Sequence, residues 1–206
     1  MQSFEKKKRV IIALHGWTGN IRSLQYLAKH WNFTETDWIY IQGPYKAKPG
    51  GHSWFEGNDI EGWKYEKSFQ KLKEQIQNLL NDDYQYNQIY ILGFSQGACL
   101  AMEFMIRQEF SIGGIVAISG FIIYKNEFKK ERNILSQNTA ILLLHGEKDN
   151  VINPKESKMA YKIFKDLDYK TDIHIFKGSH KIPLRANRLI QKKIFKNKNN
   201  SRNITN

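Results

Sequence analysis

Cysteine is almost absent from the sequence, and long hydrophobic runs are missing altogether. One cysteine in 206 residues cannot form an internal disulfide, which excludes a disulfide-stabilised scaffold. No apolar run approaches the ~20 residues that a membrane-spanning helix needs. The basic N-terminus is followed by an apolar run over residues 10–14 only, which is too short for the core of a signal sequence. Together these absences predict a protein of the reducing cytoplasm.

Acidic residues are also scarce relative to basic ones. The chain has 20 aspartates and glutamates against 32 lysines and arginines, which gives a formal net charge of +12. Such a surface could bind nucleic acid or an anionic membrane, but the joint abundance of Lys, Asn and Ile also suits a general compositional bias. Because no basic stripe with interleaved aromatic residues is visible, we expect no nucleic-acid partner. A transient contact with an anionic membrane stays open.

Hydrophobic residues make up 41% of the chain and aromatic residues 13%, which is typical of a folded domain. The length suits one domain with a sizeable core, and we assign residues 1–195 to it. Residues 196–206 are basic and rich in Asn, with few apolar side chains. We therefore expect a frayed tail there.

Short apolar runs alternate with segments of helical periodicity along most of the chain. The expected strands are residues 9–14, 37–41, 89–92, 112–118, 140–144 and 172–176, and the clearest expected helices follow residue 95 and cover 65–80, 154–167 and 183–195. Apolar strands separated by helices predict an α/β fold with a mostly parallel central sheet covered on both faces. Ligands of such sheets bind beyond the carboxyl ends of the strands.

The most informative stretch is Gly93-Phe-Ser-Gln-Gly97, a G-x-S-x-G pattern between an expected strand and an expected helix. This context is that of a nucleophile elbow, in which a serine occupies a sharp, strained turn. Small residues on either side let the strand and the helix approach closely. The turn exposes the Ser95 hydroxyl and directs the first amides of the helix at whatever that hydroxyl attacks. The alternative is an ordinary strand-to-helix turn.

A nucleophilic serine needs a histidine base, and that base needs an acid to orient it. In folds with this elbow, the order along the chain is serine, acid, histidine. Of the six histidines, only His180 follows the last expected strand in a loop. Asp149 lies in the loop after the preceding strand and is the favoured acid, while Glu147 in the same loop competes with it.

An acyl-transfer site also needs hydrogen-bond donors for the oxyanion that forms during the reaction. The backbone N–H of Gln96, directly after the serine, is one candidate. The loop His15-Gly16-Trp17 follows the first strand, so the Trp17 N–H is suitably placed to be the second. His15-Gly16 also suits a plain strand-ending turn.

These motifs together resemble the phospholipase/carboxylesterase family of α/β hydrolases, which includes the acyl-protein thioesterases. The matching segments occur in the family's order over nearly the whole chain, at residues 14–17, 53–56, 93–98, 117–120, 144–149 and 178–180. The resemblance implies an α/β-hydrolase fold with Ser95 as nucleophile, Asp149 as its acid partner and His180 as base. It also implies an oxyanion hole formed by the Trp17 and Gln96 amides. It implies no metal and no cofactor.

The chain departs from the family pattern at two positions. Glu56 stands where the family has an acid shorter by one carbon, and Trp17 stands where it has Leu in a loop of small residues. The Trp17 side chain is expected to crowd the mouth of the acyl pocket. Trp54 and Phe55 lie in the long segment 43–62 and are expected to wall the pocket, or else to be ordinary core aromatics.

We therefore expect a serine hydrolase that cleaves carboxylic esters or thioesters through an acyl-enzyme. Its substrate could be a small ester, a lipid such as a lysophospholipid, or an acylated protein, and another hydrolase reaction on the same scaffold stays open. A hypothesis from a different class is an inactive module that binds through its basic surface. The three triad residues in the right order argue against that module. The sequence does not decide between a monomer and a homodimer.

Overall fold

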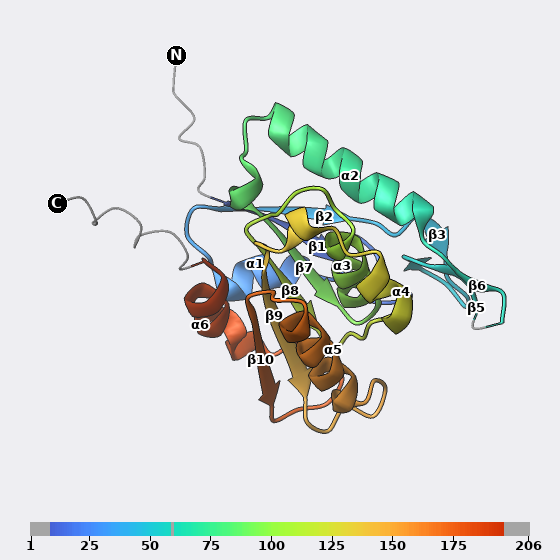
Figure 1. Cartoon of the computed structure of the whole chain (residues 1–206). Coiled ribbons are helices and arrows are strands. Elements are labelled where there is room, and N and C mark those ends of the chain that lie inside the picture. The colour runs from blue at the N-terminus through green and yellow to red at the C-terminus, as the bar shows by residue number, and fades with distance from the viewer. Residues whose placement is uncertain (1–8, 59, 196–206) are drawn as a thin grey trace, which may run out of the picture.

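A parallel β-sheet forms the centre of the molecule in this computed structural model (Figure 1). In the part of the chain that the structure describes, residues 9–58 and 60–195, the main sheet has six strands in the order β10-β9-β8-β7-β1-β2. Their bounds are β1 Arg9–Leu14, β2 Thr36–Ile41, β7 Ile89–Phe94, β8 Gly114–Ile118, β9 Ala140–Gly146 and β10 Thr171–Phe176. All five neighbouring pairs are parallel, which confirms the expected α/β class.

Helices cover both faces of the sheet, and a separate hydrophobic cluster lies under each cover. On one face the helices are α2 (Glu66–Asn81), α3 (Gln96–Ile106), α4 (Lys125–Lys130) and α5 (Pro154–Asp166). On the other face they are α1 (Gln25–Trp31) and α6 (Asn187–Ile190). The sequence explains the orientation of α2, because Leu72, Ile76 and Leu79 recur at helical spacing and are its large buried side chains.

The segment after β2 differs from the long loop that the sequence predicts. It folds into two small antiparallel pairs, β3 (Tyr45–Lys46) with β4 (His52–Ser53), and β5 (Glu56–Asn58) with β6 (Gly62–Lys64). Strands of two or three residues are too short to leave an alternating hydrophobic pattern, so the sequence gives no signal for them. In Figure 1 the β5–β6 pair projects from the end of α2.

The C-terminal helix is also less regular than expected. A short 3₁₀ turn over Leu184–Ala186 precedes α6, and a π-helical turn over Gln191–Phe195 follows it. The tail predicted for residues 196–206 lies outside the described residues. Within the described ranges, no helix combines the length and the apolar character that crossing a membrane requires.

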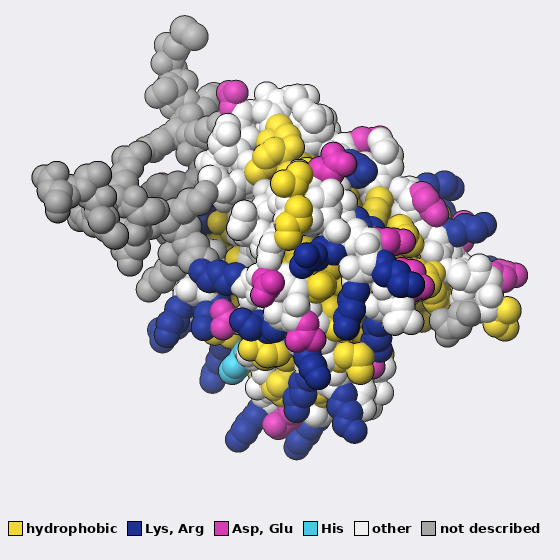
Figure 2. All heavy atoms as spheres, in the orientation of Figure 1, with side chains coloured by type: hydrophobic (Ala, Val, Ile, Leu, Met, Phe, Trp, Pro, Cys, Tyr) yellow, Lys and Arg dark blue, Asp and Glu magenta, His cyan; other side chains and the backbone are white. Residues whose placement is uncertain are grey.

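Basic side chains gather over one end of the molecule. Figure 2 shows Lys and Arg concentrated over its lower part, where α5 and β10 lie in Figure 1. Helix α5 alone presents four exposed lysines, Lys155, Lys158, Lys162 and Lys165. The positive charge of the sequence is therefore displayed on this surface.

Candidate active site

Ser95 lies in a strained turn between β7, which ends at Phe94, and α3, which begins at Gln96. Its backbone has φ 53° and ψ −117°, a combination that L-residues other than glycine rarely adopt. The Ser95 N–H donates to the carbonyl of Ile118 at 2.8 Å, so the pairing between β7 and β8 reaches the serine itself. The sheet thus holds the strained residue at its carboxyl edge.

The two glycines of the motif are required by close backbone contacts. A Cβ atom at Gly93 would lie 2.2 Å from the carbonyl oxygen of Gly97, and one at Gly97 would lie 2.3 Å from that of Leu14. Any larger residue at either position would push α3 away from the sheet. The expected nucleophile-elbow geometry is therefore present, with β1 packed directly against it.

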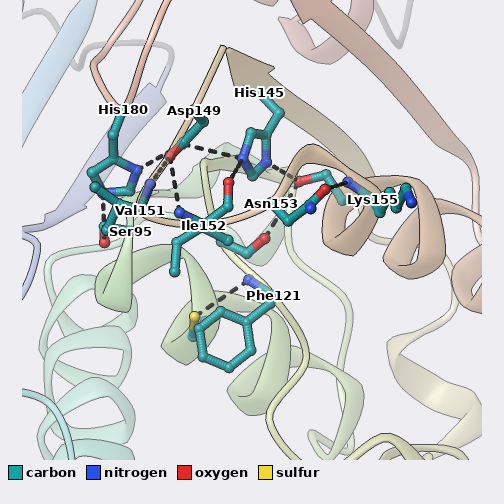
Figure 3. A network of polar contacts seen from close by, with 12 residues as sticks. Ser95, Phe121, His145, Asp149, Val151, Ile152, Asn153, Lys155 and His180 are labelled. Carbon is teal, nitrogen blue, oxygen red and sulfur yellow. Dashed lines mark hydrogen bonds and ion pairs between the residues drawn. The ribbon is translucent and has the colours of Figure 1, made fainter. Parts of the chain in front are cut away.

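Three side chains form a continuous hydrogen-bonded chain at this edge (Figure 3). Ser95 Oγ lies 3.0 Å from His180 Nε2, and His180 Nδ1 lies 2.7 Å from Asp149 Oδ2. Asp149 comes from the loop after β9 and His180 from the loop after β10. The fold thus brings together the three residues that sequence order selects, whereas Glu147, the alternative acid, is exposed.

The Asp149 carboxylate is fully buried, with no exposed side-chain surface. Its Oδ1 accepts two hydrogen bonds of 2.9 Å, from the N–H groups of Val151 and Ile152. Burial by itself would raise the pKa of the Asp149 carboxyl. These amide donors and the His180 side chain outweigh that effect and hold the pKa below its ordinary value. The Asp149 carboxylate is therefore ionised at neutral pH.

The single cysteine lies close behind the elbow but is not a competing nucleophile. Cys99 is buried, and its N–H donates to the Ser95 carbonyl at 3.1 Å. Burial raises the pKa of its thiol to about 12, so the reactive thiolate does not form at neutral pH.

The His15-Gly16-Trp17 loop follows β1 and lies against the elbow. A Cβ atom at Gly16 would be 3.4 Å from the Cβ of Ser95. His15 anchors this loop from inside, because its Nδ1–H donates to the Gly16 carbonyl at 2.7 Å and its Nε2 accepts the Gly43 N–H at 3.0 Å. A ring nitrogen that accepts a backbone N–H carries no proton, so His15 is neutral. Burial, the largest influence, lowers its pKa accordingly.

Gln96 connects the elbow to the segment around β4. Its side-chain Oε1 accepts the Trp54 N–H at 2.8 Å, and its Nε2 donates to Ser53 Oγ at 2.9 Å. The indole N–H of Trp54 in turn donates to the His15 carbonyl at 2.7 Å. Trp54 therefore links the two segments whose amides are the expected oxyanion donors.

Trp54 and Phe55 do not form the open pocket wall that was expected. They are 0% and 3% exposed and belong to the hydrophobic core cluster that contains α3. The short strand pairs turn these rings inward, where the indole and backbone groups of Trp54 find hydrogen-bond partners. The second interpretation, ordinary core aromatics, matches their position.

A surface cavity of about 430 Å³ instead opens beside His180. Its walls include Trp17, Tyr26, Phe94, His180 and Lys181. Trp17 is 57% exposed, so its ring borders this opening while its backbone remains in the loop beside Ser95. Within the ranges that the structure describes, no cluster of three or more His, Cys, Asp or Glu side chains suits a metal ion.

Sequence reasoning missed two features of the site, the Gln96–Ser53 link and the contact of His145 with Asp149. His145 Nε2 lies 3.2 Å from Asp149 Oδ2, and the His145 side chain is completely buried. The one available signal was the repetition of Leu-His-Gly, at residues 14–16 and 144–146, at the carboxyl ends of two strands.

Comparison with known proteins identifies the family of this chain. The family model described as Phospholipase/Carboxylesterase matches residues 1–198. The chain belongs to the phospholipase/carboxylesterase family. Acyl-protein thioesterase 1 of the yeast Debaryomyces hansenii is 32% identical over 122 residues, which are 58% of this chain and 52% of that relative. The match therefore spans about half the length of this curated relative.

A protein of known structure shares the architecture. A crystal structure of the Arabidopsis thaliana protein SOBER1 superposes with a TM-score of 0.80 at 17% identity, covering 91% of this chain and 97% of that one. The molecule has the α/β-hydrolase fold of the family. Another relative, from rice, is named a probable inactive carboxylesterase and is 19% identical over 187 residues, 82% of this chain and 76% of that protein. Family membership alone therefore does not establish turnover.

Proposed function

We propose that this protein is a serine hydrolase that cleaves carboxylic esters or thioesters through an acyl-enzyme on Ser95. The observation that carries the proposal is the hydrogen-bonded chain from Ser95 Oγ through His180 to the buried carboxylate of Asp149. It stands at a strained elbow with an adjacent loop for the oxyanion. The lone, buried Cys99 supports a cytoplasmic site of action.

In the proposed reaction, Ser95 Oγ attacks the acyl carbon while His180 Nε2 takes the hydroxyl proton. The negative oxygen of the tetrahedral intermediate is held by the N–H groups of Gln96 and Trp17. His180 then passes its proton to the leaving alcohol or thiol, and the bond to the leaving group breaks. Water, deprotonated by the same imidazole, cleaves the acyl-enzyme and returns Ser95 to its starting state.

The relatives and the cavity beside His180 support the proposed substrate class. Relatives named acyl-protein thioesterase favour a thioester of an acylated protein. The aromatic lining by Trp17, Tyr26 and Phe94 suits an apolar acyl chain. A lysophospholipid or a small ester would present the same carbonyl to Ser95, so these remain the competing substrates within the proposed reaction.

The second candidate is an inactive module that binds anionic partners. The basic surface over α5 and the inactive rice relative favour it. Under this hypothesis the elbow would be a structural remnant, and Ser95 would not react with an acylating or phosphonylating reagent.

An active-site-directed fluorophosphonate separates the two candidates. We expect the wild-type protein to be labelled on one serine, Ser95→Ala to remain unlabelled, and Ser111→Ala, a serine away from the site, to label normally. A series of p-nitrophenyl esters beside acyl-CoA thioesters then defines acyl length and leaving group. Labelling of Ser95→Ala at the wild-type rate would refute the nucleophile, and failure of the wild-type protein to react at all would favour the binding module.

A further inference from the structure

The triad acid is contacted by two histidines, of which the proposed reaction uses only one (Figure 3). Asp149 Oδ2 lies 2.7 Å from His180 Nδ1 and 3.2 Å from His145 Nε2. His145 is the penultimate residue of β9 and lies four residues before Asp149 in the sequence. Its side chain has no exposed surface, whereas His180 keeps 16% of its side chain exposed towards the cavity.

The partners of the His145 ring fix where its hydrogen lies. Nε2 faces two oxygens that can only accept, the Asp149 carboxylate and the Ile152 carbonyl at 2.9 Å. Nε2 therefore carries a hydrogen, which it donates to the Ile152 carbonyl, and this N–H also lies 3.2 Å from the Asp149 carboxylate. On the other side of the ring, Nδ1 lies 2.6 Å from Ser157 Oγ in α5, which locks the ring in this orientation.

His145 completes the surroundings of the carboxylate. Oδ1 accepts hydrogen bonds from the N–H groups of Val151 and Ile152, and Oδ2 is hydrogen-bonded to His180 and lies 3.2 Å from His145 Nε2. Three of these four neighbours, Val151, Ile152 and His145, take no part in the reaction. Without His145, Oδ2 would depend on His180 alone, the group that must gain and lose a proton during turnover.

We propose that His145 is a positioning residue, whose Nε2–H holds Asp149 Oδ2 in line with His180 Nδ1 throughout the catalytic cycle. This inference rests on the proposed function, because it concerns the same triad. It goes beyond that function by assigning a role in turnover to a buried histidine that never touches the substrate.

Two substitutions separate this role from simple packing. The amide nitrogen of His145→Gln can reach the place of the imidazole Nε2, so this variant keeps a donor towards Asp149. The shorter side chain of His145→Asn places its amide near Nδ1, so this variant keeps only the contact with Ser157. His174→Leu, an exposed position on β10, serves as a control for losing a histidine near the site.

The test measures kcat and KM on one p-nitrophenyl ester, with folding checked by circular dichroism. We expect His145→Asn to lower kcat about ten- to a hundredfold with KM within about twofold, because it loses the polar N–H that faces the charged Asp149 carboxylate. We expect His145→Gln to keep most of the wild-type kcat. Equal kcat in the two variants, whether high or low, or greater loss in His145→Gln, would overturn the proposal.

Two further variants keep the test decisive. Should either substitution at His145 prevent folding, Ser157→Ala removes only the group that locks the ring. We expect a severalfold lower kcat at unchanged KM, and a wild-type kcat would overturn the proposal. Ser95→Ala, assayed in parallel, isolates the proposed function. If Ser95→Ala is active, the proposed reaction fails, whereas if it is inactive but the Gln and Asn variants do not separate, only the role of His145 fails.

Discussion

The same three residues, Leu-His-Gly, occur at the carboxyl ends of β1 and β9, but the two histidines make opposite kinds of contact. Both follow a leucine at the carboxyl edge of the sheet, and both are buried, His15 at 1% exposure and His145 at 0%. His15 Nε2 accepts a backbone N–H, that of Gly43, and its partners are uncharged. His145 Nε2 instead donates to the Ile152 carbonyl and lies 3.2 Å from the carboxylate of Asp149.

The difference arises from what the fold places opposite each ring. Segment 43–55 packs against the end of β1 and supplies two uncharged donors, the Gly43 N–H and the indole N–H of Trp54. The tight turn after β9 instead places the Asp149 carboxylate beside His145, at the end of the same strand. His15 therefore fixes the loop that is expected to hold the oxyanion, and His145 lies against Asp149, the proposed acid of the triad. The β1 end is a neutral scaffold and the β9 end a charged one.

The largest expected effect lies at the charged end. Asp149→Asn should lower kcat by roughly 10⁴, because an amide favours the wrong tautomer of His180. Glu147→Gln, two residues away and exposed, is the matched control and should remain near wild type. Steady-state kinetics on one ester substrate provide the measurement. If Glu147→Gln is the damaging change, the acid has been assigned to the wrong carboxylate.

At the end of β1, where the contacts of His15 are uncharged, we expect a smaller loss of kcat. His15→Leu leaves the Gly43 N–H and the Gly16 carbonyl without their partner, so the loop carrying the Trp17 N–H loses its anchor. Loss of an oxyanion donor typically lowers kcat by roughly 10²–10³, and we expect the loss of kcat in His15→Leu to be no greater than this. The exposed His30→Leu is the control. A His15→Leu enzyme that is well folded and fully active would show that the oxyanion loop needs no such anchor.

The pH dependence of stability should also distinguish the two ends. The folded-state pKa of His15 lies below the ordinary value of 6.5, so the unfolded chain binds a proton first as pH falls. The free energy of unfolding should therefore decrease as pH drops below 6.5. The pKa of Asp149 is also lowered, but its contribution is lost only as pH falls below 3.8. Urea unfolding of the wild type and of His15→Gln between pH 7 and 5 measures the contribution of His15. The same dependence of the free energy of unfolding on pH in both proteins would contradict a neutral His15.

The smallest expected effect concerns the Trp17 side chain, since only its backbone N–H is needed for the oxyanion. Trp17→Leu should leave the rate on short acyl chains unchanged and shift the preference towards longer ones. Each additional buried CH₂ contributes ~0.8 kcal/mol at most, about fourfold in kcat/KM. An acyl-length series on both proteins measures the shift. Identical profiles would mean that the ring, although it borders the cavity, does not contact the acyl chain.

The sequence predicts the strands and the three residues of the chain at Ser95 because both depend on strong local patterns. Apolar runs mark β1, β7, β8 and β9, and the order of Ser95, Asp149 and His180 follows from the elbow.

Contacts across the chain leave no such pattern. Nothing local indicates that Trp54 points inward to the His15 carbonyl rather than outward to a pocket. The role of a histidine that ends a strand likewise depends on which loop returns to it, so His145 could not be separated from His15 by sequence alone.

The position of β1 within the sheet has a consequence for the protein as it is being synthesised. One edge of β1 pairs with β2, where Arg9 lies opposite Thr36, and β2 leaves the ribosome soon after β1. The other edge of β1 pairs with β7, where Val10 lies opposite Ile89, and β7 is synthesised much later. Until β7 emerges, the nascent chain holds a short two-stranded sheet with one apolar edge unpaired. Such an edge is a template for pairing with other chains. We therefore expect this protein to be most prone to aggregate during the interval between synthesis of β2 and of β7. During that interval β1 has not yet paired with the strand that leads to Ser95.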